Sequence, residues 1–302
     1  MAAENRDNND VTATYLDSTG AAAGSGLTVD AGTVTVSGIT ANDNAGGGAS
    51  LSAGTAISVS DSVFSDNGWY GSGSEIYFDN EGDEGMAANY FHDAGLSAYS
   101  GSIALLNVIA TGNGGAGFYG ELAPASQGLL SVTGGEFSGN GFGGYGMMFD
   151  STTDGSQSET IAGAGIELSG PQDVTLLDVI ANNNAGAGAL ISIEGSATIT
   201  GGIFSGNGSL LNERTDDGDT YQFYAGGLMV DADTGVVVEE VTASNNGGDG
   251  ALLDSWGGSV MVVCSTTNDN GGYGLFSEHG PVTLDGLATT GNTLGTYSVF
   301  GG

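Results

Sequence analysis

Three carboxylates stand at the same point of three consecutive repeats in this chain. Asp231, Asp254 and Glu278 each follow, by four residues, a glycine that opens a repeat. Stacked strands lie roughly 4.8 Å apart, so these side chains are expected to form an outward column. Two carboxyl groups about 5 to 10 Å apart can cleave a glycosidic bond. Like charges this close also recruit cations, and we favour a solvated or cation-bridged face over catalysis.

The other reactive side chains do not form a catalytic set. His92 and His279 belong to repeats six apart, or roughly 29 Å along a stack of strands, so they cannot share one site. Cys264 closes an apolar run, Val260–Cys264, and is predicted to be a packed structural thiol. No Ser-His-Asp triad is indicated.

Two acidic loops favour a calcium ligand. Oxygen-bearing side chains alternate before glycines in both, which resembles calcium-binding loops without matching an EF-hand. A plain charged loop is the alternative. The predicted metal ligands are Asp79, Glu81 and Asp83 in the first loop, and Asp216, Asp217 and Asp219 in the second.

The charge balance excludes several partners. The chain of 302 residues has 36 acidic residues against Arg6 and Arg214, no lysine, and a net charge of −34. Nucleic acid needs basic side chains to replace its counterions, and anionic membrane surfaces are disfavoured for the same reason. Self-repulsion on this scale predicts stabilisation by cations or salt.

The sequence also indicates where the chain works. No apolar run is long enough to span a membrane, and the polar segment Met1–Asp10 lacks the hydrophobic region of a signal peptide. We expect an extracellular or cell-surface protein whose signal peptide is not part of this chain.

Regularly spaced asparagines indicate the period of the repeat that must position these side chains. Each is usually four residues before the glycine that opens the next repeat, and uninterrupted copies are 22 to 24 residues apart. That length is one coil of a parallel β-solenoid. Asparagine suits tight turns, tolerates the left-handed conformation and can form stacked amide ladders. The column consists of Asn44, Asn67, Asn113, Asn140, Asn184, Asn207, Asn246, Asn270 and Asn292.

Each coil is predicted to contain three short strands whose alternate residues point inward. Before the asparagine, odd coils place a large residue and then a small one, as in Ile39 and Ala41. Even coils reverse the order, as in Ser62 and Phe64. A phenylalanine can therefore lie over an alanine of the next coil, which makes the true repeat two coils long.

The chain divides into a short segment and a solenoid. Residues 1–25 precede the repeat as a strand and linker, and residues 26–302 form nine to ten coils. Three loop insertions, at about 72–94, 145–164 and 208–226, follow the asparagine turn once per two-coil repeat. They should emerge from one edge, where per-repeat insertions often bind ligands.

The glycine-opened coils, the Val-x-Val strands and the asparagine turns resemble right-handed parallel β-helix repeats, the pectate-lyase-like superfamily. They are closest to the repetitive β-helix modules of large prokaryotic surface proteins, over residues 26–300. The resemblance implies an all-β, right-handed, three-sheet parallel β-helix. Lyases of this superfamily usually rely on an Arg or Lys base, whereas this chain has no Lys, Arg6 precedes the solenoid and Arg214 lies in an insertion, so a lyase is not expected.

These observations predict a non-catalytic structural or adhesive module. We expect it to be stabilised by Ca²⁺ and to stack head to tail into fibres, with residues 11–16 donating a strand, or to adjoin flanking repeats of a longer chain. The alternatives are a module that binds surface glycans and a polysaccharide-active enzyme. Such an enzyme would be a carboxylate-based glycosidase, with Asp231, Asp254 and Glu278 as its catalytic residues.

Overall fold

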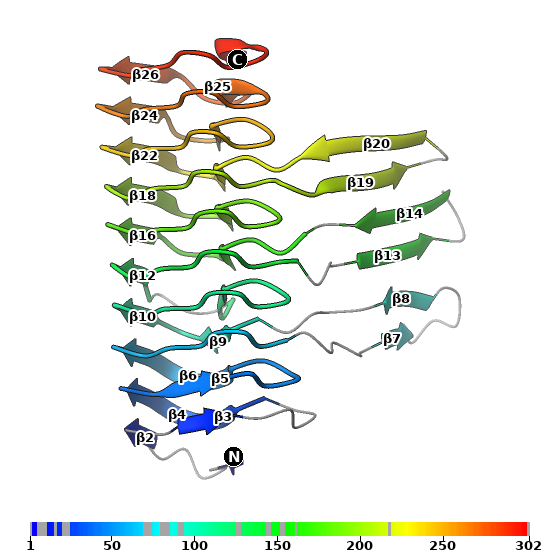
Figure 1. Ribbon diagram of the computed structural model, residues 1–302, viewed down its shortest axis with the longest axis vertical. Coiled ribbons are helices and arrows are strands. Elements are labelled where there is room, and N and C mark those ends of the chain that lie inside the picture. The colour runs from blue at the N-terminus through cyan, green and yellow to red at the C-terminus, as the bar shows by residue number, and fades with distance from the viewer. Residues whose placement is uncertain are drawn as a thin grey trace.

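The computed structural model describes residues 2–4, 11–14, 17–19, 25–68, 74–78, 85–89, 94–124, 128–142, 146–151, 155–160, 162–216 and 219–300. Side chains are described in 25–68, 94–124, 128–142, 162–210 and 224–300. Within these ranges the regular elements are all β-strands, and no helix is long and apolar enough to cross a bilayer. The chain winds into a column of stacked coils (Figure 1).

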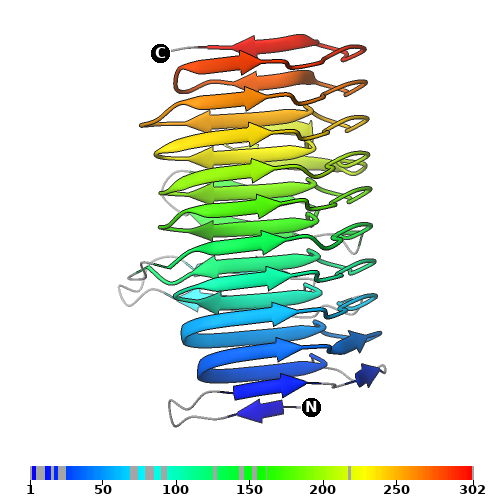
Figure 2. The same ribbon diagram turned by 90° about the vertical axis from the view of Figure 1, so that its left-hand side faces the viewer.

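The first sheet is formed by the strand that follows each opening glycine. All its pairings are parallel, and each strand pairs with its counterparts in the coils above and below. Figure 2 shows these strands stacked along the whole column. The sheet contains the first halves of β4 (Leu27–Ser37) and β6 (Ala49–Ser60), then β9 (Leu96–Ser100), β11 (Phe118–Leu122), β15 (Ile166–Gly170), β17 (Ala189–Ile193), β21 (Leu228–Ala232), β23 (Ala251–Ser255), β25 (Tyr273–Ser277) and β27 (Gly295–Val299).

The second sheet is also parallel. In the coils after β6, two to seven residues separate the end of the first-sheet strand from the start of the second-sheet strand. It contains the second halves of β4 and β6, then β10 (Ile103–Leu106), β12 (Leu130–Thr133), β16 (Val174–Leu177), β18 (Ser196–Thr200), β22 (Gly235–Glu239), β24 (Val260–Val263) and β26 (Val282–Asp285).

The third side is narrower than predicted. Apart from β5 (Thr40–Asn42), it is a ladder of single bridges that runs from Thr40 through Val63 and Ile109 to Ala288. Left-handed residues bound this side in each coil, as at Asp61 (φ 48°) and Asp66 (φ 57°). Only four residues lie between them, so this side holds a single bridge or, as at β5, three residues of strand.

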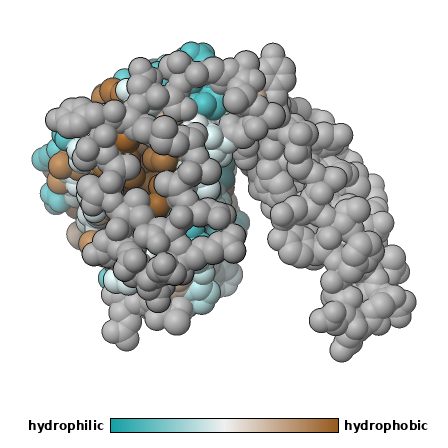
Figure 3. Space-filling model, turned by 90° about the horizontal axis from the view of Figure 1, so that it is seen from below, coloured by the Kyte–Doolittle hydropathy of each residue, from teal (hydrophilic) through white to brown (hydrophobic). Residues whose placement is uncertain are grey.

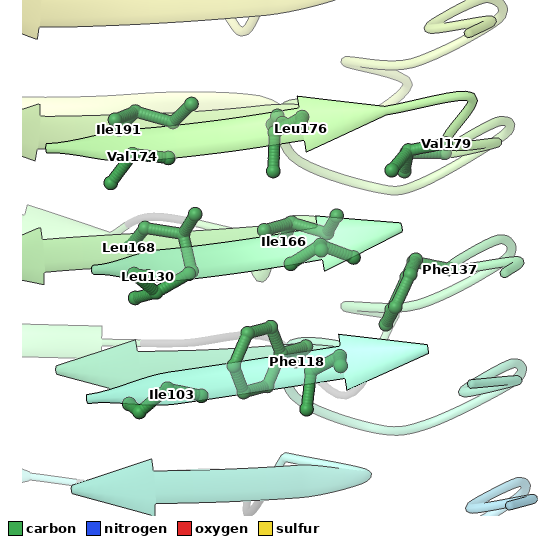
Figure 4. Packing of buried hydrophobic residues seen from close by; sticks show 14 of the residues in the cluster. Ile103, Phe118, Leu130, Phe137, Ile166, Leu168, Val174, Leu176, Val179 and Ile191 are labelled. Carbon is green, nitrogen blue, oxygen red and sulfur yellow. The ribbon is translucent and has the colours of Figure 1, made fainter. Parts of the chain in front are cut away.

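The interior is the predicted column of alternating large and small side chains. The bridge register sets Phe64 beside Ala41 and Ala110, and all three are fully buried. Phe137 and Phe204 are buried at the same position in later coils. Figure 4 shows these rows of side chains stacked from coil to coil, and Figure 3 shows hydrophobic residues inside the coil seen end-on.

The asparagine column forms a continuous amide ladder. Both the backbone N–H and Nδ2 of Asn113 donate to Oδ1 of Asn140, at 3.0 Å each. Asn140 repeats both bonds to Asn184. The left-handed residue of this turn is the one before each asparagine, such as Asn183 (φ 56°), so tolerance of that conformation does not explain the asparagine itself.

The opening glycines are required by this ladder. A Cβ on Gly188 would lie 2.7 Å from Nδ2 of Asn207 and 2.5 Å from the carbonyl oxygen of Gly227. The glycine and the asparagine of a coil are therefore one structural unit, since the amide occupies the space that a side chain would need.

The N-terminal segment continues the stack. β1 (Ala2–Glu4) and β2 (Val11–Thr14) pair in parallel with β4, and β3 (Asp17–Thr19) pairs with β5. The segment that we expected to donate a strand to a neighbour therefore pairs, over 11–14, with its own chain.

The three inserted stretches hold antiparallel hairpins that leave the column on one side (Figure 1). Two of the hairpins join through β14 and β19 into a four-stranded sheet, whereas the sequence predicted only loops. The pairs are β7 (Ser74–Phe78) with β8 (Gly85–Asn89), β13 (Gly146–Ser151) with β14 (Gly155–Thr160), and β19 (Leu211–Asp216) with β20 (Asp219–Tyr224).

Candidate functional site

The carboxylate column singled out in the sequence lies on the outer face of the first sheet. Asp231 and Asp254 are register partners on β21 and β23, and Glu278 directly follows β25. Oδ1 of Asp254 accepts the backbone N–H of Glu278 at 2.7 Å and that of His279 at 3.2 Å. Asp254 thus caps the next coil, and its side chain is only 15% exposed.

A tryptophan that sequence reasoning missed lies beside this column. Trp256 is 62% exposed, and its indole Nε1 donates to Oδ1 of Asp231 at 2.9 Å. Its ring stacks on His279 with centroids 3.7 Å apart and an interplanar angle of 24°. Strand alternation could have found it, because Trp256 is two residues after Asp254 and so faces outward too.

His279 lies between the Trp256 ring and the carboxylate of Asp254. Its Nδ1 lies 3.9 Å from Oδ1 of Asp254, and that nitrogen is buried without a hydrogen-bond partner among the described residues. The imidazole therefore serves as a support for the Trp256 indole, whose outer face remains open to solvent.

A groove of about 470 Å³ adjoins Asp231 at the turn between the first and second sheets. It crosses four coils, from β11 to β21. Four carboxylates line it together with two serines and two prolines, and Leu122, Ile193 and Gly170 complete the lining, so its wall is acidic and in part apolar. These residues are Glu121, Glu194, Asp231, Asp233, Ser169, Ser192, Pro124 and Pro171.

Among the described residues that line the groove, none is basic and able to balance its charge. The chain's two arginines are Arg6 and Arg214, which lie outside the ranges whose side chains the structure describes. Lysine is absent from the sequence. The groove can therefore accept hydrogen bonds from hydroxyl, amide or ammonium donors, and it repels anions.

A second cluster of titratable residues lies on β11 and β15, at the N-terminal end of the groove. The register pairs Tyr119 with Glu167 and Glu121 with Ser169. The phenol of Tyr119 donates to Oε2 of Glu121 at 3.1 Å. Burial, and then the nearby Glu121 carboxylate, raise the pKa of Tyr119.

Glu167 is the more perturbed acid of this cluster. Burial raises the pKa of its carboxyl group, and a hydrogen bond from the backbone N–H of Ala164, at 3.1 Å, partly offsets this. Burial likewise raises the pKa of Asp249, which accepts the N–H of Tyr273. Each of these two carboxyl groups thus accepts one hydrogen bond from a backbone N–H.

The predicted calcium ligands fall largely beyond the described part of the chain. Asp79, Glu81, Asp83 and Asp217 lie outside the described residues, as does His92. Asp216 and Asp219 are register partners at the tip of the β19–β20 hairpin, with backbone alone described. Where side chains are described, no group of three His, Cys, Asp or Glu residues is placed to hold a metal ion.

The prediction of a packed thiol was wrong. Cys264 is exposed and adopts a left-handed conformation, with φ 47°, at the turn after β24. The inward alternation of Val260 and Val262 places residue 264 on the inner side only if the strand continues. The strand ends at Val263, and the turn at Cys264 rotates the thiol outward.

Comparison with known proteins places the chain in a family. Residues 76–218 and 160–295 match the right-handed β-helix region family. The solved A-module of the Azotobacter vinelandii mannuronan C-5 epimerase AlgE4 has a TM-score of 0.58 and 14% identity, covering 99% of this chain and 79% of that one. No curated protein sequence matches. The chain therefore belongs to the right-handed β-helix family.

Proposed function

We propose that this β-helix is an extracellular, non-catalytic module that binds a polysaccharide along its acidic groove. The observation that carries the proposal is Trp256, which is exposed and hydrogen-bonded to Asp231, one of the four carboxylates that line the groove. An immobilised aromatic face beside polar groups suits a sugar ring, which has an apolar face and a hydroxyl rim.

The spacing of the coils supports a polymeric ligand. The groove runs across four coils, and neighbouring coils are about 4.8 Å apart. That step is comparable with the length of one pyranose unit, so successive units can meet equivalent positions of successive coils.

A binding experiment tests this function. Wild-type protein and Trp256→Ala are titrated calorimetrically with soluble neutral polysaccharides, and Phe142→Ala, at an aromatic residue that is 46% exposed, is the matched control. We expect Trp256→Ala to weaken binding by about tenfold and the control to leave it unchanged. Equal binding by all three proteins would contradict the proposal.

Hydrolysis of the bound polysaccharide is the second candidate. It is favoured by the position of Glu167, the register partner of Tyr119, whose phenol donates to Glu121, because two neighbouring carboxyl groups are the minimum set of a glycosidase. Release of reducing ends that is lost in Glu167→Gln would favour this candidate. A module that only binds the polysaccharide would release no reducing ends.

Self-association belongs to the same proposal. β27 pairs with β25 on one side, and Tyr297 and Phe300 are 55% and 61% exposed beside it. A second copy that stacked there would extend the parallel sheets and cover both rings. Light scattering across a concentration series, with and without Ca²⁺, measures this. A monodisperse monomer throughout would remove self-association from the proposal.

A further inference from the structure

We infer that the groove selects polysaccharides that carry positive charge, that is, amino sugars with free amines. This inference rests on the proposed function and names its ligand class. It follows from the arrangement of the carboxylates, from what they are bonded to, and from the aromatic surface at the end of the groove.

The carboxylates follow the direction in which a polymer would lie. Register pairing aligns Glu121, Ser169, Ser192 and Asp231 in one row across four successive coils. Glu194 and Asp233 are two residues further along their coils and are exposed. Carboxylates therefore lie within the row, as Glu121 and Asp231, and two residues beyond it, as Glu194 and Asp233, which we call the rim acids.

The rim acids are held one coil apart by the backbone. The N–H of Glu194 donates to the carbonyl of Gly170, and the N–H of Asp233 donates to the carbonyl of Ile193, both at 3.1 Å. This continues the parallel stacking into the turn. A cationic group bound between these two coils would therefore meet a negative charge from each of them.

The hydrogen bonds to the groove acids come from neutral groups. Asp231 accepts the indole N–H of Trp256, and Glu121 accepts the phenol of Tyr119. Neither donor neutralises a carboxylate. The groove thus has directed acceptors whose charge is uncompensated, and an ammonium group with three donors satisfies both needs at once.

Trp256 independently points to the same class of ligand. Its outer face is open while its inner face rests on His279. An indole face attracts the C–H groups of a sugar ring, and it attracts a nearby ammonium group more strongly. Neutral sugars gain only the stacking, uronates add repulsion, and amino sugars gain stacking and charge pairing together.

The test compares three oligosaccharides of equal length: a glucosamine oligomer, its fully N-acetylated counterpart and a uronate oligomer. Binding is measured by calorimetry at moderate ionic strength, at a pH where the amines are protonated and carboxylates are ionised. The variants are the groove pair Glu194→Gln/Asp233→Asn and a matched pair, Glu239→Gln/Asp285→Asn, on exposed ends of β22 and β26.

For wild-type protein we expect the glucosamine oligomer to bind about tenfold more tightly than the acetylated oligomer. The groove pair should remove that preference, and the matched pair should keep it. A preference lost equally in both pairs would mean non-specific attraction to a chain of net charge −34 and would overturn the inference.

Failure of the inference and of the proposed function are distinguishable. Equal affinity for the charged and acetylated oligomers, sensitive to Trp256→Ala, would overturn charge selection and leave polysaccharide binding intact. Absence of binding to any of the three oligomers and to the neutral polysaccharides would overturn both.

Discussion

The indole N–H of Trp256 donates to the carboxylate of Asp231 across the boundary between two coils, at 2.9 Å. The bond fixes an exposed ring at the end of the groove to a residue that lines the groove. A change at Asp231 should therefore alter the aromatic surface as well as the charge.

We expect Asp231→Ala to free the Trp256 ring and to lower the free energy of unfolding by about 1 kcal/mol. Acrylamide quenching of fluorescence, in a Trp69→Phe background, reports the freedom of this ring. Asp231→Asn keeps an oxygen acceptor and should quench like the parent. Identical quenching of the alanine variant would show that the bond does not restrain the ring.

Loss of one ladder asparagine should be severe. Asn140→Ala removes the acceptor of the backbone N–H of Asn113 and one of the two acceptors of its Nδ2, in a fully buried position, which should cost about 3 kcal/mol. Urea unfolding measures this. Asn107→Gly is the control, because that exposed left-handed position is already glycine at Gly134 and Gly201, and it should change stability by less than about 0.5 kcal/mol.

An opening glycine should not tolerate a methyl group. Gly188→Ala forces a Cβ against Asn207 and against the backbone of the next coil, and it should destabilise the protein by about 1 to 3 kcal/mol. Gly54→Ala is a matched control, since its Cβ would meet only the carbonyl oxygen of Gly32, at 3.9 Å. Equal melting temperatures for the two variants would refute the steric role.

The stability of the fold should depend on pH through Glu167. The folded state raises the pKa of this carboxyl group, so it retains a proton that the unfolded chain has already released. Stability should therefore fall as pH rises from the ordinary glutamate range through the raised pKa. Glu167→Gln keeps the acceptor for Ala164 and should lack this loss, whereas Glu239→Gln controls for the change in net charge. Parallel pH profiles of wild type and Glu167→Gln, followed by chemical denaturation, would contradict the assignment.

Cations should raise the melting temperature. Screening of a net charge of −34 predicts a rise with sodium chloride, and a site in the hairpin loops predicts a further rise with Ca²⁺ at equal ionic strength. The variant Asp216→Asn/Asp217→Asn/Asp219→Asn should lose only the second rise. Identical melting temperatures in Ca²⁺ and in chelator, at matched ionic strength, would contradict a calcium site in the hairpin loops.

The coil architecture could be predicted because its causes are local and repeated. Alternation identified which residues face inward, and the exchange of Ile39–Ala41 for Ser62–Phe64 identified how neighbouring coils pack. The spacing of the asparagines located each turn. These signals recur in nearly every coil, so one irregular copy does not obscure them.

The groove and the aromatic pair could not be predicted in the same way. The groove depends on how turns of different length, such as those at Pro124 and Pro171, lie over one another. The stack of Trp256 on His279 joins residues of two coils through the path of a turn. Pairing of β14 with β19 likewise joins two insertions whose sequences show no common period.

The amide ladder gives the solenoid a direction. Each asparagine donates toward the C-terminal coil and accepts from the N-terminal one, so the bonds along the column polarise one another in the same sense. Because each coil of a solenoid contacts only its neighbours, cooperative unfolding depends on the contacts between coils, and we expect this ladder to couple them along the column. Interruption near Asn140 would divide it into two cooperative blocks, one on each side of the break.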